Sequence, residues 1–408
     1  MSRTIISAAL VLLALSQRPT TPEFIGITAS AAPTAASQQT ATPTKAESAP
    51  PVQTAEKATS NGLTKAEFAR LVAELSEPGG YFDTDNLISN ESSYLHVMGK
   101  LRQMGVSGGA YIGVGPDQSY SYIAQIRPRI AYIIDIRRDN MLQHLFFKSL
   151  FALADNRIEY LSLLFGKPAP TNLKQWNNRS INEISDYLDK TPAKRELFLA
   201  TRAQIAEQLK SFGVPLSSSD LETINHIHES FFEAGPDLKF TSHNRTPRSY
   251  YPNYRELMLE KDLTGKQANY CGSEEAFQFL KTMQAQNLVV PVVGNLAGER
   301  ALTAIGKDIA ACKLKVSAFY TSNVEFYLMQ EGVFDQFAQN VKQLPRDERS
   351  VIIRSYFSGG YGYRHPQAVS GYYSSQLLQP IESMVREYSR GGIKTYGELV
   401  TKDSLELR

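Results

Sequence analysis

Short apolar runs alternate with segments of helical spacing over most of the chain. The apolar runs are 110–115, 129–135, 288–293, 316–320 and 351–356. Their near-continuous Val, Ile, Ala, Tyr and Phe content is typical of strands that are buried on both faces. Helices are expected between them at 119–126, 140–165, 274–285, 301–311 and 334–344. Strands that alternate with helices indicate a doubly wound α/β fold with a mostly parallel sheet.

One long segment interrupts this alternation. Residues from about 167 to 255 are polar, with helical spacing between breaks, and we interpret them as a helical insertion. Within it, Ser219-Asp220-Leu221-Glu222 predicts a capping box that opens a helix running to Phe232. The α/β domain with its insertion is expected to extend over 63–408, beginning with a helix in which Phe68, Leu71, Val72 and Leu75 share one face.

The first 62 residues have a different character. Arg3 followed by the apolar run 5–15 resembles a signal peptide within 1–31, or else an N-terminal anchor, and the run is too short to span a membrane. Residues 32–62 are rich in Ala, Thr, Ser and Pro, which predicts a disordered linker. We therefore expect an exported protein, periplasmic or extracellular, with no transmembrane domain after signal removal.

Composition and charge narrow the possible partners. The 43 Lys and Arg residues nearly balance the 41 Asp and Glu residues, and no long block of one sign occurs, so a nucleic-acid partner is not expected. The two cysteines, Cys271 and Cys312, fit either a disulfide or two buried thiols. No Cys-x-x-Cys pair exists and the six histidines are scattered, so no metal site is predicted.

The most informative stretch is the first strand–turn–helix–strand unit. Gly113 and Gly115 end the first apolar run, Asp117 and Gln118 lie just before the next helix, and Asp135 ends the second run. Glycines let a backbone approach a ligand closely, and an acid about 20 residues later can accept hydrogen bonds from ribose hydroxyls. Gln118 stands where a dinucleotide-binding fingerprint needs its third glycine, which argues against NAD or FAD. The glycines also fit a simple turn, and Asp135 also fits a helix cap or an ion pair with Arg137 or Arg138.

Ligands of open α/β sheets bind beyond the carboxyl ends of the strands. The candidate cofactor-binding residues selected by this rule are Gly113, Gly115, Asp117, Gln118, Asp135, Arg137, Asn295 and Asn323. Glu325 and Arg354 follow or end later strands, and each asparagine could equally serve a turn. Gly105-Val106-Ser107-Gly108-Gly109 matches Gly-x-Ser-x-Gly, but the strand follows the motif, whereas a nucleophile elbow requires the strand before it.

Several short blocks in order resemble a family of uncharacterised bacterial proteins with a class I methyltransferase-like Rossmann core. The blocks are 113–118, 135–138, 273–277, 290–295, 318–325 and 352–355. The resemblance implies a methyltransferase-like fold with a helical insertion, and S-adenosylmethionine as a possible cofactor. Tyr111 and Asp117 depart from the acid and the last glycine of the methyltransferase motif. Because that cofactor is cytosolic, export favours a binding or structural module over the alternative, an active enzyme that binds a nucleoside-containing ligand.

Overall fold

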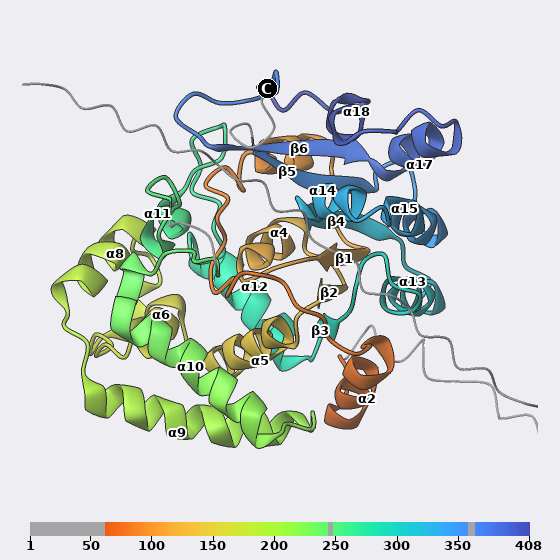
Figure 1. Cartoon of the computed structure of the whole chain (residues 1–408). Helices are drawn as coiled ribbons and strands as arrows, with labels where there is room; N and C mark the ends of the chain where they lie inside the picture. The colour runs from red at the N-terminus through yellow and green to blue at the C-terminus, as the bar shows by residue number, and fades with distance from the viewer. Residues whose placement is uncertain (1–61, 244–247, 358–363) are drawn as a thin grey trace, which may run out of the picture. The chain divides into compact units, whose positions relative to one another are not determined.

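The computed structural model describes residues 62–243, 248–357 and 364–408, and these residues contain one six-stranded sheet (Figure 1). The strand order is β3-β2-β1-β4-β5-β6. Neighbouring strands are parallel from β3 to β5, and β6 pairs antiparallel with β5. The strands are β1 (Ala110–Gly113), β2 (Ile130–Asp135), β3 (Val289–Val293), β4 (Val316–Ser322), β5 (Val351–Phe357) and β6 (Ser374–Pro380).

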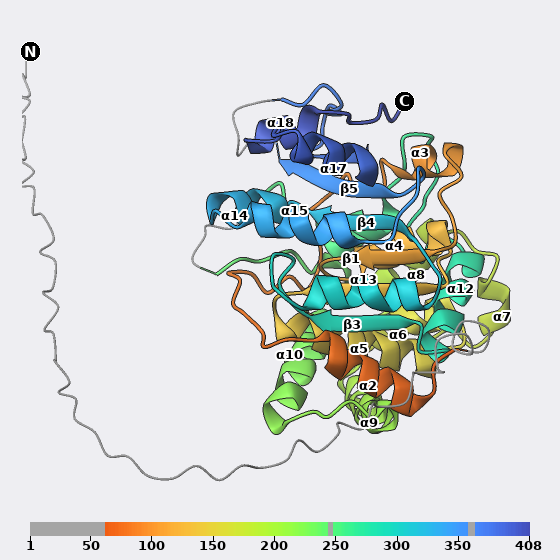
Figure 2. The ribbon, with the colours of Figure 1, turned by 90° about the vertical axis from the view of Figure 1, so that its right-hand side faces the viewer.

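Helices cover both faces of the sheet. On one face lie α4 (Gln118–Ile126), α5 (Arg138–Leu153) and α12 (Glu274–Ala285) (Figure 1). On the other face, which Figure 2 turns toward the viewer, lie α13 (Ala301–Ala311), α15 (Phe334–Gln343) and α17 (Ile381–Ser389). The remaining helices around the sheet are α2 (Lys65–Leu75), α3 (Met98–Gln103), α14 (Val324–Gln330) and α18 (Tyr396–Thr401). The prediction of an α/β fold with a mostly parallel sheet is confirmed.

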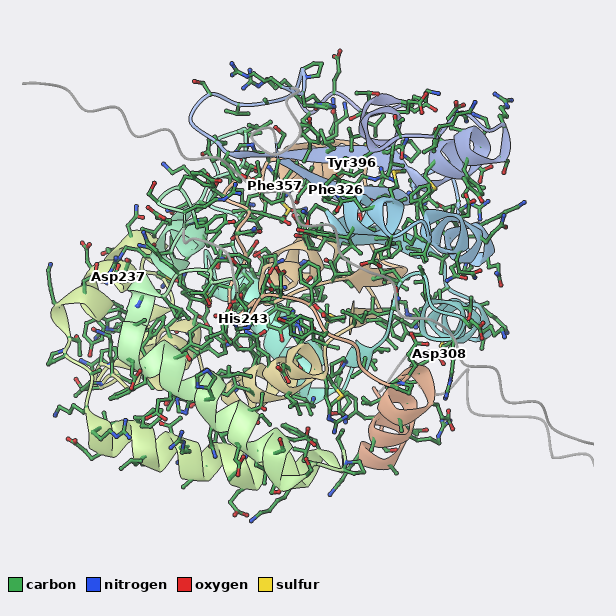
Figure 3. All side chains as sticks on the ribbon, in the orientation of Figure 1. Asp237, His243, Asp308, Phe326, Phe357 and Tyr396 are labelled. Atoms are coloured by element: carbon green, nitrogen blue, oxygen red, sulfur yellow. The ribbon has the colours of Figure 1, made fainter. Side chains whose placement is uncertain are left out.

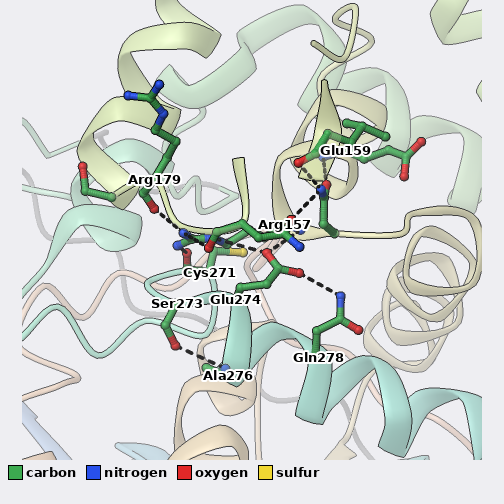
Figure 4. A network of polar contacts seen from close by, with 12 residues as sticks. Arg157, Glu159, Arg179, Cys271, Ser273, Glu274, Ala276 and Gln278 are labelled. Atoms are coloured by element: carbon green, nitrogen blue, oxygen red, sulfur yellow. Dashed lines mark hydrogen bonds and ion pairs between the residues drawn. The ribbon is translucent and has the colours of Figure 1, made fainter. Parts of the chain in front are cut away.

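A group of helices extends from α5 away from the sheet (Figure 1). Its members are α6 (Arg157–Leu164), α7 (Leu173–Trp176), α8 (Ile181–Lys190), α9 (Arg195–Phe212), α10 (Ser218–Ala234), η1 (Gly235–Asp237) and α11 (Tyr254–Leu259). Buried Arg157 links this group of helices to the start of α12 through hydrogen bonds and an ion pair (Figure 4). Its guanidinium donates to the Cys271 carbonyl at 2.8 Å and to the Arg179 carbonyl, and forms an ion pair with Glu274 at 3.4 Å.

Two local predictions are wrong in their details. The helix expected over 140–165 is two helices, because α5 ends at Leu153 and Asn156 starts α6, accepting from the Glu159 N–H at 3.1 Å. The capping box of α10 is formed by Ser217 and Asp220, two residues before the predicted start. In both places a polar N-cap residue, whose role depends on backbone geometry, sets the start of a helix.

The core lies between the sheet and its two helical layers. Every residue of β1, β3 and β5 is buried, as the continuous apolar runs predicted, and side chains fill the space on both faces (Figure 3). At the β6 edge, the Phe326 and Tyr396 rings lie 5.3 Å apart and join α14 to α18. Of the predicted segments, 1–31 and all but the last residue of 32–62 lie outside the described residues. Among the helices of the described ranges, none is both long and apolar enough to cross a membrane.

Candidate functional site

A cavity opens at the carboxyl ends of β1, β2, β3 and β4, where a doubly wound fold binds its ligands. Six of the sequence-predicted residues line it, namely Gly115, Gln118, Asp135, Arg137, Asn295 and Asn323. Its outer wall comes from the segment before β1 and from α14, through Tyr81, Phe82, Thr84, Asn86, Tyr327 and Glu331. Phe240, from the end of the helical insertion, also lines it. The cavity is therefore built from residues far apart in the sequence.

The segment 76–91, which we call the crossing segment, runs over the carboxyl edge of the sheet. The Glu77 N–H donates to the Val293 carbonyl at 2.9 Å, and Glu77 Oε1 accepts from the Asn295 N–H at 2.7 Å. Further along, the Gly80 N–H donates to the Ile136 carbonyl at 2.7 Å. These bonds hold the crossing segment to the ends of β3 and β2, so that its middle forms the cavity wall.

The turn after β1 contacts a buried histidine, His144. Gly115 has a φ of +78°, which favours glycine. Its carbonyl lies 2.9 Å from His144 Nε2, and His144 Nδ1 lies 2.7 Å from the Tyr120 hydroxyl. Burial lowers the pKa of His144 to about 4, so the ring is neutral at physiological pH. A neutral ring that donates from Nε2 and accepts at Nδ1 satisfies both contacts.

Gly113 does not line the cavity. A Cβ added there would lie 2.5 Å from the Tyr111 hydroxyl oxygen, so glycine makes room for the tyrosine ring. Tyr111 is fully buried, and its hydroxyl donates to Ser119 at 3.3 Å. The glycine therefore has a packing role in the turn.

Asp117 points away from the cavity into a cluster of tyrosines. Its Oδ2 accepts from the Tyr254 hydroxyl at 2.8 Å and from the Tyr270 hydroxyl at 2.9 Å. Burial raises the pKa of Asp117 to about 6, and the two hydroxyl donors only partly offset this effect. The carboxyl group thus joins the β1–α4 turn to α11 and to the loop before α12.

Asp135, the predicted ribose-binding acid, lies at the cavity and is held by Arg137. Oδ1 accepts from the Arg137 backbone N–H at 2.9 Å and from Nε at 3.1 Å, while Oδ2 accepts from Nη2 at 2.9 Å. Arg137 Nη1 also donates to the carbonyls of Thr84 and Asp85 in the crossing segment. A carboxylate has about four acceptor positions, so Asp135 retains one, on Oδ2.

The two asparagines line the cavity mainly as turn residues. Asn295 Oδ1 accepts from the Ala297 N–H at 2.9 Å, which is an Asx turn after β3. Asn323 precedes α14, and its side-chain oxygen lies 3.4 Å from the Ser322 hydroxyl oxygen. Glu325 and Arg354 form a fully buried ion pair at 2.9 Å, outside the cavity lining.

The residue that sequence reasoning missed is Glu91, at the base of the cavity. Only 1% of Glu91 is exposed, and its carboxylate accepts from Tyr320, Ser322, Ser355 and Gln376. Burial raises the pKa of Glu91, while these four donors oppose that rise. Glu91 lies in an irregular segment without a motif, so only the order of the strands reveals its neighbours.

Other predicted features lie elsewhere. Ser107 of the Gly-x-Ser-x-Gly match precedes β1, at the opposite edge of the sheet from the cavity, and no helix follows it. Cys271 and Cys312 are free thiols. Over the ranges that the structure describes, no cluster of three or more His, Cys, Asp or Glu side chains could hold a metal ion.

Comparison with known proteins identifies the family of this chain. No curated protein matches the chain. Residues 87–390 match the model of a domain of unknown function, DUF7790. That match begins inside the crossing segment and ends in the chain after α17, so it includes the whole sheet. The chain therefore belongs to the DUF7790 family.

Proposed function

We propose that the protein is a binding module on a methyltransferase-like scaffold and that its cavity binds a small nucleoside-type ligand. The observation that carries this proposal is the meeting of the Gly115 turn, Asp135 and an aromatic pair at one cavity. Gly115 has no Cβ to block the approach of a ligand to the backbone. Asp135 keeps one acceptor position, enough for one ribose hydroxyl.

The aromatic pair supports recognition of a base. The Phe82 and Tyr327 rings meet edge to face with centroids 5.0 Å apart, and both residues line the cavity. Both are only partly buried, so ring surface remains for a planar ligand. Stacking on an aromatic side chain accepts any base, because every base has a π-face.

Calorimetric titration of adenosine, S-adenosylhomocysteine and S-adenosylmethionine tests this proposal. We expect saturable binding of at least one of them below about 1 mM. Phe82→Ala should weaken it by roughly 1–3 kcal/mol, the range for one stacked base. Phe279→Ala is the matched control, since Phe279 is a partly buried phenylalanine on α12 that does not line the cavity. No heat from any of the three compounds would refute the proposal.

A second candidate is an active methyltransferase-like enzyme. The strand order favours it, because an antiparallel strand, β6, follows the order 3-2-1-4-5, as in a methyltransferase-like sheet. The buried Glu91 carboxyl at the cavity also favours it. Incubation with radiolabelled S-adenosylmethionine and an extract of the host tests it. Label transferred to an acceptor in a Glu91-dependent manner supports the enzyme, and the absence of transfer despite cofactor binding leaves the binding module.

We also propose that the protein is exported, on the basis of Arg3 and the apolar run 5–15. N-terminal sequencing of native protein should find a mature start between about residues 17 and 33. An intact Met1 in a cytosolic fraction would contradict export.

A further inference from the structure

Glu91 is a buried carboxylate surrounded by donors that carry no charge. Oε2 accepts from the Tyr320 hydroxyl at 2.5 Å, from the Gln376 amide at 2.9 Å and from the Ser355 hydroxyl. Oε1 accepts from the Ser322 hydroxyl alone. No Lys, Arg or His contacts this carboxylate among the described residues, although buried carboxylates are usually paired.

The hydroxyl protons around Glu91 are oriented by a second ring of contacts. The Tyr320 hydroxyl oxygen accepts from Gln118 Nε2 at 3.3 Å, so its own proton is directed to Glu91. In the same way, the Ser355 oxygen accepts from Gln376 Nε2, so its proton is also directed to Glu91. Donors fixed in this way favour the ionised carboxylate. The hydrogen bonds around Glu91 therefore favour the negative charge that its burial opposes.

Ser322, which donates to Glu91, has a strained backbone conformation. Its φ is +54°, in the left-handed region that non-glycine residues seldom adopt, and the register of β4 with β5 shifts between Tyr320 and Ser322. This conformation directs the Ser322 hydroxyl to Glu91. Strained residues of this kind concentrate at functional sites.

Two acceptor positions close to the Tyr320 hydroxyl have no donor. One is the second position on Glu91 Oε1, and the other is Gln118 Oε1, which is buried and without a partner. Gln118 is 6% exposed, both residues line the cavity, and both contact the Tyr320 hydroxyl. A single ligand group with several N–H donors could satisfy both oxygens.

The charge of the lining points in the same direction. Three carboxylates line the cavity, those of Glu91, Asp135 and Glu331, against the single guanidinium of Arg137. That guanidinium is already paired with Asp135. The described lining is therefore net negative and favours a cation.

We propose that the cavity recognises an ammonium group on its ligand, which donates hydrogen bonds to Glu91 Oε1 and Gln118 Oε1. The ligand class is then a nucleoside that bears a primary amine. This inference rests on the proposed function, since the amine is a further part of the same ligand.

The experiment compares three nucleosides and one simple amine by calorimetry at pH 7. The probes are 5′-amino-5′-deoxyadenosine, 5′-deoxyadenosine, adenosine and n-butylamine. We expect the amino nucleoside to bind about tenfold or more tightly than 5′-deoxyadenosine, the effect of one charge-assisted hydrogen bond. Glu91→Gln should abolish this preference. Glu348→Gln, an exposed carboxylate in the loop before β5 and at the opposite edge of the sheet, is the matched control and should retain it.

Gln118→Leu keeps the proposal testable if Glu91→Gln does not fold, because it removes the second acceptor and leaves the carboxylate. It should reduce the preference for the amine severalfold. Equal binding of the amino and deoxy nucleosides would overturn the ammonium site and leave the proposed function intact. Glu91-dependent binding of n-butylamine without binding of any nucleoside would support the ammonium site and refute the nucleoside. The absence of binding by all four probes would overturn both.

Discussion

Asp117 should make the protein less stable as the pH rises from about 4 to about 6. In the unfolded chain its carboxyl has the ordinary pKa of 3.8, and burial in the folded protein raises it to about 6. Between these values the folded protein holds a proton that the unfolded chain has released. The free energy of unfolding therefore falls as the pH rises through the folded pKa.

The size of the effect follows from the two pKa values. Their difference is about 2 units, and each unit corresponds to about 1.4 kcal/mol, so the loss between pH 4 and pH 7 is about 3 kcal/mol. Asp117→Asn removes the titration while its amide oxygen still accepts from the Tyr254 and Tyr270 hydroxyls. The variant should match the wild type near pH 4 and exceed it in stability near pH 7.

Urea denaturation at several pH values between 4 and 8 measures this difference directly. Wild type and variant share every other titrating group, so the difference between their unfolding free energies isolates Asp117. A pH-independent difference for Asp117→Asn would refute the assignment of a raised pKa.

Three further expectations concern the turn and the carboxyl edge. His144→Gln should reduce the loss of stability at acid pH. Burial lowers the pKa of His144 from 6.5 to about 4, so the neutral imidazole contributes stability that is present above pH 6.5 and lost as the pH falls toward 4. Urea denaturation of wild type and variant at pH 4.5 and 7 measures this loss. Gly115→Ala should lower stability by about 1 kcal/mol or more, because φ is +78°, and an unchanged melting temperature would contradict a strained turn. Asp135→Asn should lower stability by about 3 kcal/mol, since it leaves the Arg137 guanidinium nearly buried without a charge partner; full stability in urea would show that the pair has no structural role.

The sequence predicted the sheet well where burial is complete. The runs that became β1 to β5 are apolar because both faces of each strand are covered, and this signal is local. β6, with the sequence Ser-Ser-Gln-Leu-Leu-Gln-Pro, carries no such signal. Its polar residues are nevertheless buried, because Gln376 donates to Glu91 and Gln379 accepts from Arg354. A strand whose polar side chains are satisfied by distant partners cannot be distinguished from a loop by its pattern.

The location of the site was also predictable from the sequence, but the direction of its side chains was not. The rule that ligands bind at the carboxyl ends of strands selected six residues that share one cavity, since strand order alone brings these ends together. The rule could not tell which way a side chain points. Asp117 turns toward Tyr254 and Tyr270 rather than the cavity. Glu91 was missed because its partners lie on β4, β5 and β6, more than two hundred residues away in sequence.

Most of the crossing segment lies outside the region that defines the family. The match to DUF7790 begins at residue 87, whereas Tyr81, Phe82 and Thr84 of the cavity wall, and Glu77 which anchors it, precede that position. The shared region contains the sheet, the β1 turn and Glu91, which form the floor of the cavity. Proteins that share only this region can carry a different crossing segment, and so a different part of the wall, over the same floor. Ligand selectivity could then diverge within the family through a short stretch of chain that its defining region does not include, without any change in the sheet.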